Sequence, residues 1–254
     1  MLSLISRKMR SHFLTLIAAG ALLSLAGCGT GRMHAIKNTS RTFSTVVVDA
    51  GHGGRDSGAV RRYGPPEKIV ALDVAQRIDK KLHESQIKTV MTRTGDVFIP
   101  LDTRVAIENS QKNAIFVSIH FNDSRRRGIH GFETYYHSPA AYDLAERIQS
   151  KLLTLPNAVN RGVHVANFRV LRNAVYPAVL VECGFLSNRF EGGSARNSDH
   201  RDDLADKIAE AIVEMRYGPG AYQGGAQSVV EQASAASANT TSPSKPPPLG
   251  SMVR

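Results

Sequence analysis

The segment Val46–Gly58 restricts the fold more than any other part of the chain. It opens with three consecutive valines, and a loop with four glycines in eight positions follows. A β-branched apolar run favours a buried strand, and glycines allow the tight backbone that a loop around a small ligand or ion requires. His52 lies at the end of this predicted strand, where open α/β sheets bind ligands. Taken alone, His52 fits either a histidine that caps a strand or a ligand.

Two later segments end in the same way. The apolar run that begins at Ala114 reaches His120 and then the turn-forming residues Asn122 and Asp123. The run that begins at Ala178 ends at Glu182. A carboxylate at the end of a buried strand is costly unless it is paired or used, so Glu182 requires an explanation.

Alternating strand and helix patterns predict a single α/β domain over residues 43–217. A helix is expected after Pro65 and Pro66, with Glu67 in its first turn. Its apolar face is predicted to contain Ile69, Leu72, Ala75, Ile78 and Leu82. Further helices are expected over 101–109, 140–153 and 203–215, and further strands over 87–92, 131–136 and 168–171.

The composition indicates a folded domain that lies between a polar segment and a tail of low apolar content. The chain has 254 residues, 42% of them hydrophobic, which excludes disorder throughout. Residues 28–42 are polar and are interpreted as a tether, while residues 218–254 are rich in Gly, Ser, Ala, Thr and Pro and are predicted to be disordered. The net charge of +10 permits anionic partners, but no nucleic-acid module signature is present and no nucleic acid is expected.

Residues 1–27 have the organisation of a signal peptide. Arg7, Lys8 and Arg10 precede an apolar run, Phe13–Ala26, that is too short to span a bilayer comfortably. Leu25–Cys28 resembles the bacterial lipobox, which implies that Cys28 is the lipidated first residue of a mature lipoprotein. An ordinary cleaved leader and an uncleaved anchor are the alternatives.

Lipidation of Cys28 would anchor the protein to a membrane. The residue after it is Gly29 and not Asp, which by the usual sorting pattern of lipoproteins favours the outer membrane and a periplasmic location. Cys183 then has no partner for a disulfide, and it is expected to be a small buried hydrophobe.

His52, Glu67 and His120 together have the composition of a catalytic zinc site. Two imidazoles and one carboxylate suit zinc better than calcium or magnesium and leave one coordination position for water. The three residues form no compact metal motif, so their spacing leaves a structural role for each open. Glu182 supplies a second carboxylate, which can take a proton from a water whose pKa zinc lowers to about 7. This set of residues predicts hydrolysis of an amide.

Six sequence blocks occur in an order that resembles a known family. The blocks are Val47–Gly54, Glu67–Lys68, Thr92–Arg93, Ser118–Asn122, Asn160–Val163 and Val181–Asn188. Over residues 45–217 the chain resembles the zinc-dependent N-acetylmuramoyl-L-alanine amidases of the amidase type 3 family.

The resemblance implies a function and a fold. It implies that His52, Glu67 and His120 bind one zinc ion and that Glu182 is the catalytic glutamate. The implied substrate is peptidoglycan or its muropeptides, cleaved between the lactyl group of muramic acid and the first L-alanine of the stem. The implied fold is a twisted mixed sheet, here of about six mostly parallel strands, with helices on both faces.

Two segments depart from the family pattern. Some periplasmic members carry a long inserted helix that blocks the zinc until an activator displaces it. Between Tyr136 and Asn160 this chain has room for one ordinary helix, so we expect an enzyme that is not self-blocked. Residues 191–199 are expected to form a loop of open role. No cell-wall-binding repeat is attached, and we expect a monomer that depends on its lipid anchor for targeting; any activator is unidentified.

For the other polar residues considered, a surface location is expected rather than a role in the site. His137, His164 and His200 are expected to be surface histidines, and Arg125–Arg127 a solvated loop that could alternatively meet carboxylates of the stem peptide. A silent cell-wall-binding or activator module on the same fold is the main alternative function. It should lack a ligand or the second glutamate, whereas this chain has all four residues. The third hypothesis for the function is a zinc peptidase that acts on a different amide.

Overall fold

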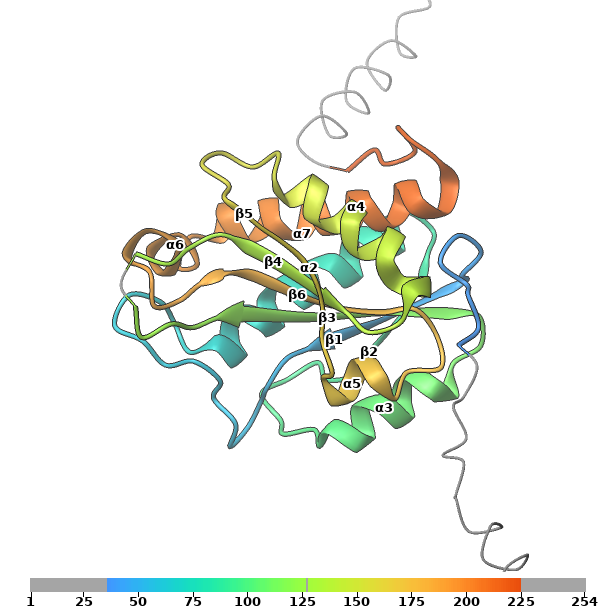
Figure 1. Ribbon diagram of the computed structural model, residues 1–254, viewed down its shortest axis with the longest axis horizontal. Coiled ribbons are helices and arrows are strands. Elements are labelled where there is room, and N and C mark those ends of the chain that lie inside the picture. Colours follow the sequence, from blue (N-terminus) through green and yellow to red (C-terminus); the bar gives the residue numbers. More distant parts are fainter. Residues whose placement is uncertain (1–35, 127, 225–254) are drawn as a thin grey trace, which may run out of the picture. The chain divides into compact units, whose positions relative to one another are not determined.

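Six strands form one mixed sheet in the computed structural model, which describes residues 36–126 and 128–224 (Figure 1). The order across the sheet is β2-β1-β3-β6-β4-β5. The strands are β1 (Thr45–Ala50), β2 (Lys88–Met91), β3 (Ala114–Asn122), β4 (Phe132–Tyr136), β5 (Asn160–Val165) and β6 (Ala178–Phe185). All neighbouring pairs are parallel except β4 and β6, which run antiparallel. The predicted α/β class, with about six mostly parallel strands, is confirmed.

Helices cover both faces of the sheet (Figure 1). They are α2 (Glu67–Glu84), α3 (Leu101–Ser110), α4 (Tyr142–Leu152), α5 (Arg169–Arg172), α6 (Arg189–Ser194) and α7 (Ser198–Tyr217). On one face α7 packs against both α2 and α4, and on the other face α3 packs against α5. The sheet is therefore buried from both sides, as parallel sheets are.

The valine run of β1 separates two hydrophobic clusters. Val46 and Val48 contribute to the cluster under α2, α4 and α7, and Val47 contributes to the smaller cluster under α3 and α5. Side chains alternate across a strand, so a strand covered on both faces needs an unbroken apolar run. β1 lies between β2 and β3, and all six of its residues are buried. Its carboxyl end is consequently held rigidly.

Helix α2 begins at Glu67, and Ala75, Ile78 and Leu82 are buried as predicted, but in its first two turns Val70 and Val74 are buried instead of Ile69 and Leu72. Val70, Val74 and Ile78 are fully or almost fully buried, whereas Ile69 is 44% exposed. The sequence 69–72 offers four apolar residues in a row, so spacing alone does not fix the inward face. The inward face also includes Glu67, and this places its carboxylate under the end of the sheet.

In the segment after α4, one expected strand is absent and one unpredicted strand is present. Residues 168–171 do not form a strand, because Arg169–Arg172 is the short helix α5 with Phe168 at its N-cap. The sixth strand is instead β5, which pairs only with β4 at the sheet edge. Four residues of β5 are exposed, so it lacks the apolar alternation by which a half-buried strand is recognised.

Two helical segments differ from prediction in their limits. The expected helix over 140–153 is a 3-10 turn, Pro139–Ala141, followed by α4. The expected loop over 191–199 contains the end of α6 and the start of α7. Asn188 and Asn197 cap these two helices through their side chains. Asparagine is a preferred N-cap residue, but the glycines at 192 and 193 favoured the prediction of a loop.

The ordered elements run from Thr45 to Tyr217. The predicted signal peptide, Cys28, the tether as far as residue 35 and the tail from residue 225 lie outside the described residues. Among the residues that are described, no helix combines the length and apolar content needed to cross a membrane. Cys183 lies in the core with 2% exposure, and burial raises the pKa of its thiol.

Candidate metal centre

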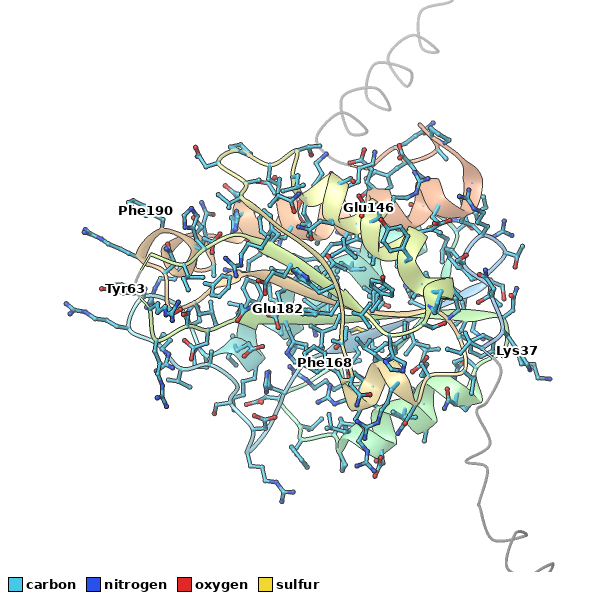
Figure 2. The ribbon with its side chains drawn as sticks, in the orientation of Figure 1. Lys37, Tyr63, Glu146, Phe168, Glu182 and Phe190 are labelled. Atoms are coloured by element: carbon cyan, nitrogen blue, oxygen red, sulfur yellow. The ribbon has the colours of Figure 1, made fainter. Side chains whose placement is uncertain are left out.

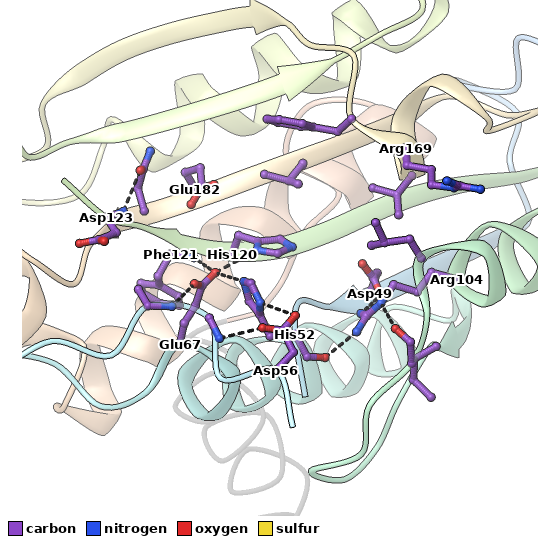
Figure 3. Close-up of a pocket in the computed structure, with 18 of the residues that line it drawn as sticks. Asp49, His52, Asp56, Glu67, Arg104, His120, Phe121, Asp123, Arg169 and Glu182 are labelled. Atoms are coloured by element: carbon purple, nitrogen blue, oxygen red, sulfur yellow. Dashed lines mark hydrogen bonds and ion pairs between the residues drawn. The ribbon is translucent and has the colours of Figure 1, made fainter. Parts of the chain in front are cut away.

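The ends of β1 and β3 and the first turn of α2 meet at one edge of the sheet (Figure 3). His52 follows β1 by two residues, His120 lies near the end of β3, and Glu67 opens α2. The Glu67 Oε1 atom lies 2.9 Å from His52 Nε2 and 2.9 Å from His120 Nδ1. One ligand atom from each residue lies within 4.8 Å of the other two, so the three side chains can hold a metal ion.

Two glycines make this convergence possible. A Cβ at Gly51 would collide with the imidazole ring of His120. A Cβ at Gly58 would collide with the Glu67 carboxylate, and Gly58 also has a φ of +61°, a conformation that glycine adopts without strain. The glycines of the loop therefore allow close approach of backbone to the ligand-type side chains, as the sequence predicted.

The Glu67 carboxylate is ionised in this environment. Burial opposes its ionisation, but hydrogen bonding to His120 and His52 outweighs burial and holds the pKa of Glu67 far below its usual range. Its Oε2 atom also accepts a hydrogen bond from the Ala59 amide at 2.9 Å, and its Oε1 atom accepts one from the Phe121 amide at 3.1 Å. The carboxylate is thus fixed in position from two sides.

Asp56 supports His52 from the side opposite Glu67. Its Oδ2 atom lies 2.9 Å from His52 Nδ1. Burial lowers the pKa of His52, but contacts with Glu67 and Asp56 more than offset this and raise it overall. This contact is an ion-pair contact and not the hydrogen bond that metal-binding histidines usually donate from their second ring nitrogen, because His52 Nδ1 has no hydrogen-bond partner among the described residues.

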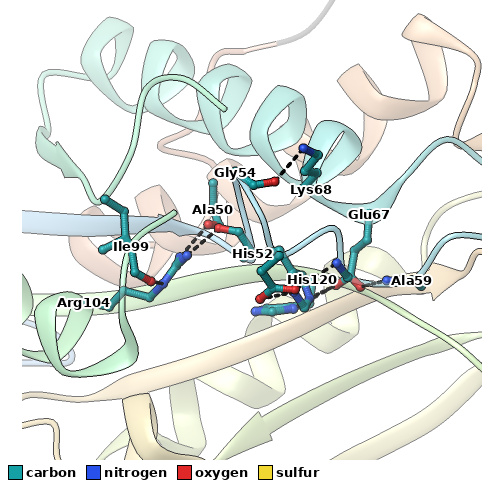
Figure 4. A network of polar contacts seen from close by, with 12 residues as sticks. Ala50, His52, Gly54, Ala59, Glu67, Lys68, Ile99, Arg104 and His120 are labelled. Carbon is teal, nitrogen blue, oxygen red and sulfur yellow. Dashed lines mark hydrogen bonds and ion pairs between the residues drawn. The ribbon is translucent and has the colours of Figure 1, made fainter. Parts of the chain in front are cut away.

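A buried ion pair joins Asp49 to Arg104, which Figure 4 shows beside Ala50 and Ile99. Arg104 of α3 and Asp49 of β1 are 3% and 1% exposed, and Arg104 Nη1 lies 2.6 Å from Asp49 Oδ1. The same guanidinium donates to the carbonyl oxygens of Ala50, His52 and Ile99. Arg104 therefore fixes the backbone that carries the first imidazole. Sequence reasoning missed it, since a single arginine in a predicted helix resembles a solvated residue.

Arg93 provides a second guanidinium to the same loop. It donates to the carbonyl oxygens of Ala50 at 2.9 Å and Gly51 at 2.6 Å. It also donates to the carbonyl oxygen of Lys68 at 2.8 Å, which ties the loop to the start of α2. The backbone carbonyls of residues 50–52 thus all accept hydrogen bonds from buried arginines.

Glu182 lies in the same cavity as the three ligand-type residues (Figures 2 and 3). It is paired with His120 in the register between β6 and β3, so both side chains project from the same face of the sheet. Its Oε2 atom is buried without a hydrogen-bond partner among the described residues. Burial, followed by the negative charges of Glu67 and Glu133, raises the pKa of Glu182 well above its usual value.

The cavity has a volume of about 960 Å³, and both polar and apolar side chains line it. Arg61, Asn122 and Asp123 are among the polar lining residues, and Phe98 and Phe168 are among the apolar ones. Arg61 Nε donates to Asp123 Oδ1 at 2.6 Å. Its role in the cavity wall was not predicted from the sequence.

The remaining candidate residues lie elsewhere. His137, His164 and His200 are absent from the cavity lining, and so are Arg125 and Arg126, while Arg127 lies outside the described residues. His137 and His164 contact the backbone carbonyl oxygens of Ala166 and Arg161.

Glu191 gives the segment after β6 a structural role. Its Oε1 atom accepts a hydrogen bond from the Gly131 amide at 2.8 Å, and its Oε2 atom accepts one from the Phe185 amide at 2.7 Å. The residue therefore connects the start of β4 to the end of β6, three residues beyond Glu182. Burial raises the pKa of Glu191 although both hydrogen bonds lower it.

Residues 46–214 match the model of the Amidase_3 family, described as N-acetylmuramoyl-L-alanine amidase. The match covers the six strands, apart from Thr45 at the start of β1, and the metal-ligand candidates. The chain belongs to this amidase family.

Relatives of this amidase-family chain include two proteins of Bacillus subtilis (strain 168). It is 36% identical over 173 residues to N-acetylmuramoyl-L-alanine amidase LytC, covering 66% of this chain but only 35% of LytC. It is 35% identical over 208 residues to the uncharacterized protein YqiI, covering 80% of this chain and 97% of YqiI. Among solved structures, N-acetylmuramoyl-L-alanine amidase AmiC2 of Nostoc punctiforme superposes with a TM-score of 0.65 and 36% identity, over 67% of this chain and 95% of that one.

The segment between β4 and β5 of this amidase-family chain contains no helix besides the 3-10 turn and α4 within the described residues. Helix α4 packs against α7 and β4, and none of its residues lines the cavity. The cavity at the metal-ligand candidates is therefore not covered by this segment.

Proposed function

We propose that this protein is a zinc-dependent hydrolase that cleaves the amide between N-acetylmuramic acid and L-alanine in peptidoglycan and releases stem peptides. The observation that carries the proposal is the meeting of His52, Glu67 and His120 in one cavity with Glu182. Membership of the amidase family supports the choice of substrate.

The residues fit one zinc ion. His52, Glu67 and His120 would hold it through two nitrogens and one oxygen, the ligand set of many catalytic zinc sites. The Glu67 Oε1 atom lies 2.9 Å from a nitrogen of each histidine, so small side-chain adjustments would bring all three ligand atoms within zinc bonds of about 2.0–2.2 Å.

Zinc bound there would polarise the scissile carbonyl and make a water molecule more acidic. Glu182 accepts a proton from the attacking water as the new C–O bond forms. It then donates this proton to the amide nitrogen as the C–N bond breaks, so that the stem peptide leaves with a free amine. A raised pKa suits both steps, because a group that gives and takes a proton works best near the operating pH.

Digestion of purified muropeptides tests the proposal. The purified protein should release peptides that begin with L-alanine, detected by mass spectrometry, and a chelator should abolish release until zinc is restored. Glu182→Gln should lower kcat about 10²- to 10⁴-fold while zinc content stays unchanged. Glu210→Gln is the matched control, because Glu210 pairs with Lys151 at 2.6 Å and is not part of the cavity wall. Cleavage at another bond, or full activity with chelator present, would refute the proposal.

We further propose that the protein is lipid-anchored at Cys28 in the periplasm, with the outer membrane favoured. The lipobox-like Leu25–Cys28 and the following Gly29 support this placement. Cys28→Ser should move the protein from the membrane fraction to the soluble fraction. Unchanged retention on membranes would refute lipidation at this residue.

We also propose that the enzyme turns over muropeptides as a monomer without displacement of a blocking helix. The position of α4 on α7, away from the cavity lining, supports this. The purified protein alone should be active, and a requirement for a partner protein would contradict the proposal.

A further inference from the structure

The described chain enters the domain at the edge of the sheet where β1, β3 and β6 begin, which we call the amino edge. Lys37 donates its backbone N–H to the Val175 carbonyl oxygen at 3.0 Å, three residues before β6. Asn113, one residue before β3, donates a side-chain hydrogen bond to the Thr42 carbonyl oxygen at 2.7 Å. The metal-ligand candidates lie at the opposite edge, and Figure 2 shows Lys37 on the far side of the molecule from Phe190.

The amino edge is far from the metal-ligand candidates and close in sequence to the proposed lipid anchor. β3 begins at Ala114 and reaches His120 six residues later, so about 20 Å of strand separates the two edges. Cys28 precedes Ile36, the first described residue, by eight residues. Eight residues extend over at most about 26–29 Å, so a lipid on Cys28 would remain near the amino edge.

Three exposed lysines extend along the amino edge, namely Lys37, Lys88 and Lys112. Lys88 begins β2 and is in register with Thr45 of β1. Lys112 comes two residues before β3. Lys37 lies against the segment before β6, with its Nζ atom 6.0 Å from the centre of the Tyr176 ring. Since neighbouring strands are about 4.8 Å apart, the three lysines span about 14 Å from β2 to β6.

No carboxylate within residues 36–126 and 128–224 forms an ion pair with these three lysines. Two acidic residues of the same edge have other partners. Asp143 Oδ2 lies 3.3 Å from Arg41 Nη2, and Glu84 Oε1 lies 3.8 Å from Lys80 Nζ. An exposed row of lysines without acidic partners is complementary to a membrane surface of anionic phospholipid headgroups.

We propose that Lys37, Lys88 and Lys112 form a docking surface for anionic phospholipid headgroups, and that this contact holds the anchored protein with the metal-ligand candidates facing away from the membrane. The inference rests on the proposed anchoring at Cys28, since that anchor brings the amino edge to the lipid. A basic patch beside a lipidated residue strengthens membrane attachment. The cavity would then face the peptidoglycan and not the lipid.

Fluorescence quenching tests this orientation. The full-length protein, purified from membranes, is reconstituted in phosphatidylcholine vesicles that contain about 30% phosphatidylglycerol and nitroxide-labelled headgroups. A fluorophore is attached through Ser44→Cys at the amino edge or through Phe190→Cys, at a residue that is 81% exposed. Cys183 is only 2% exposed, so it should not react with the fluorophore. We expect loss of fluorescence at residue 44 and none at residue 190.

The triple variant Lys37→Gln/Lys88→Gln/Lys112→Gln should abolish this difference between the labels. Neutral vesicles should abolish it too, and so should an increase in ionic strength from about 0.15 M to about 1 M, which shortens the Debye length from about 8 Å to about 3 Å. These two treatments test the same contact without a substitution, so they decide the inference if the triple variant fails to fold.

The matched control removes three exposed arginines from the loops that follow β1 and β3, at the opposite edge. It is the variant Arg62→Gln/Arg125→Gln/Arg126→Gln, and it should keep the difference between the labels. Lys88 and Lys112 also follow the C-termini of α2 and α3, where a cation offsets the helix dipole. If that were their only role, the triple variant would lower thermal stability and leave the quenching unchanged, which would overturn the inference.

Equal quenching of the two labels, or a difference that persists in neutral vesicles, also overturns the inference. So does lysine-dependent retention by purified cell wall without a quenching difference, since the lysines would then bind an anionic wall polymer. Mass spectrometry tests the anchoring separately, because an unacylated Cys28 refutes the anchoring together with this inference. Equal quenching in an acylated protein refutes the inference alone. Muropeptide cleavage should be equal in the wild type and the triple variant, and its absence from both would refute only the proposed hydrolysis.

Discussion

Replacing Arg104 tests whether this buried arginine stabilises the fold and holds His52 in position for zinc. The Arg104→Met variant keeps the apolar stem and loses the charge. It leaves Asp49 buried at 1% exposure, with hydrogen bonds only from Thr92 and Ser118. Breaking a buried ion pair by removing one partner costs about 3–5 kcal/mol. Because the two hydroxyls still satisfy Asp49, we expect a loss near the lower limit, about 3 kcal/mol, in urea denaturation at pH 7.

The same variant should also bind zinc more weakly. Arg104 donates to the His52 carbonyl oxygen, and loss of such support for a ligand typically lowers metal affinity about 10- to 100-fold. Competition with a chelating indicator measures this affinity. Arg41→Met is the control, since Arg41 forms a solvent-exposed ion pair with Asp143, whose loss should cost less than about 1 kcal/mol and leave zinc affinity unchanged. Wild-type zinc affinity in Arg104→Met would refute the idea that this guanidinium positions the first imidazole.

Three further variants or treatments follow from the structure. Gly51→Ala should lose zinc and about 1–3 kcal/mol of stability, because its added Cβ collides with His120. Gly193→Ala is the control, since nothing lies near its added Cβ, and it should lose neither. Equal zinc content and equal stability of the two variants would contradict this prediction. Glu108→Gln should raise the free energy of unfolding at pH 7 by about 1–3 kcal/mol. Burial and the charge of Asp49 raise the pKa of Glu108 in the folded state, so wild-type stability should fall as pH rises above the unfolded value of 4.5, and this fall should shrink in the variant. Chelation should abolish activity reversibly without loss of far-UV circular dichroism, because the core lies away from the metal site; cooperative unfolding on chelation would contradict this.

The sequence predicted the central strands and the metal-ligand candidates because both have local signatures. β1, β3 and β6 are covered on both faces, so each contains a run of apolar residues. His52, His120 and Glu182 follow these runs within four residues. Their convergence then follows from parallel strands ending at one edge of the sheet.

The parts that were missed depend on contacts between distant residues. Arg104 and Asp49 are 55 positions apart, and Arg161 and Glu133 are 28 apart, so no local pattern identifies either pair as buried. The edge strand β5 exposes four of its six residues and lacks a core-facing periodicity. Helix α5 has only four residues, too few to establish a helical repeat. In each case packing, and not local preference, decides the structure.

The reversal of strand direction at β4 determines which loops lie on the same side as the metal-ligand candidates. β4 runs antiparallel to β6, and β5 runs parallel to β4, so both strands begin where β1 and β3 end. The loops that enter them, residues 123–131 and 153–159, therefore border the same side of the molecule as the metal-ligand candidates. Insertions in these loops should change the surface beside the cavity, while the two histidines and Glu67, which belong to other elements, keep their positions.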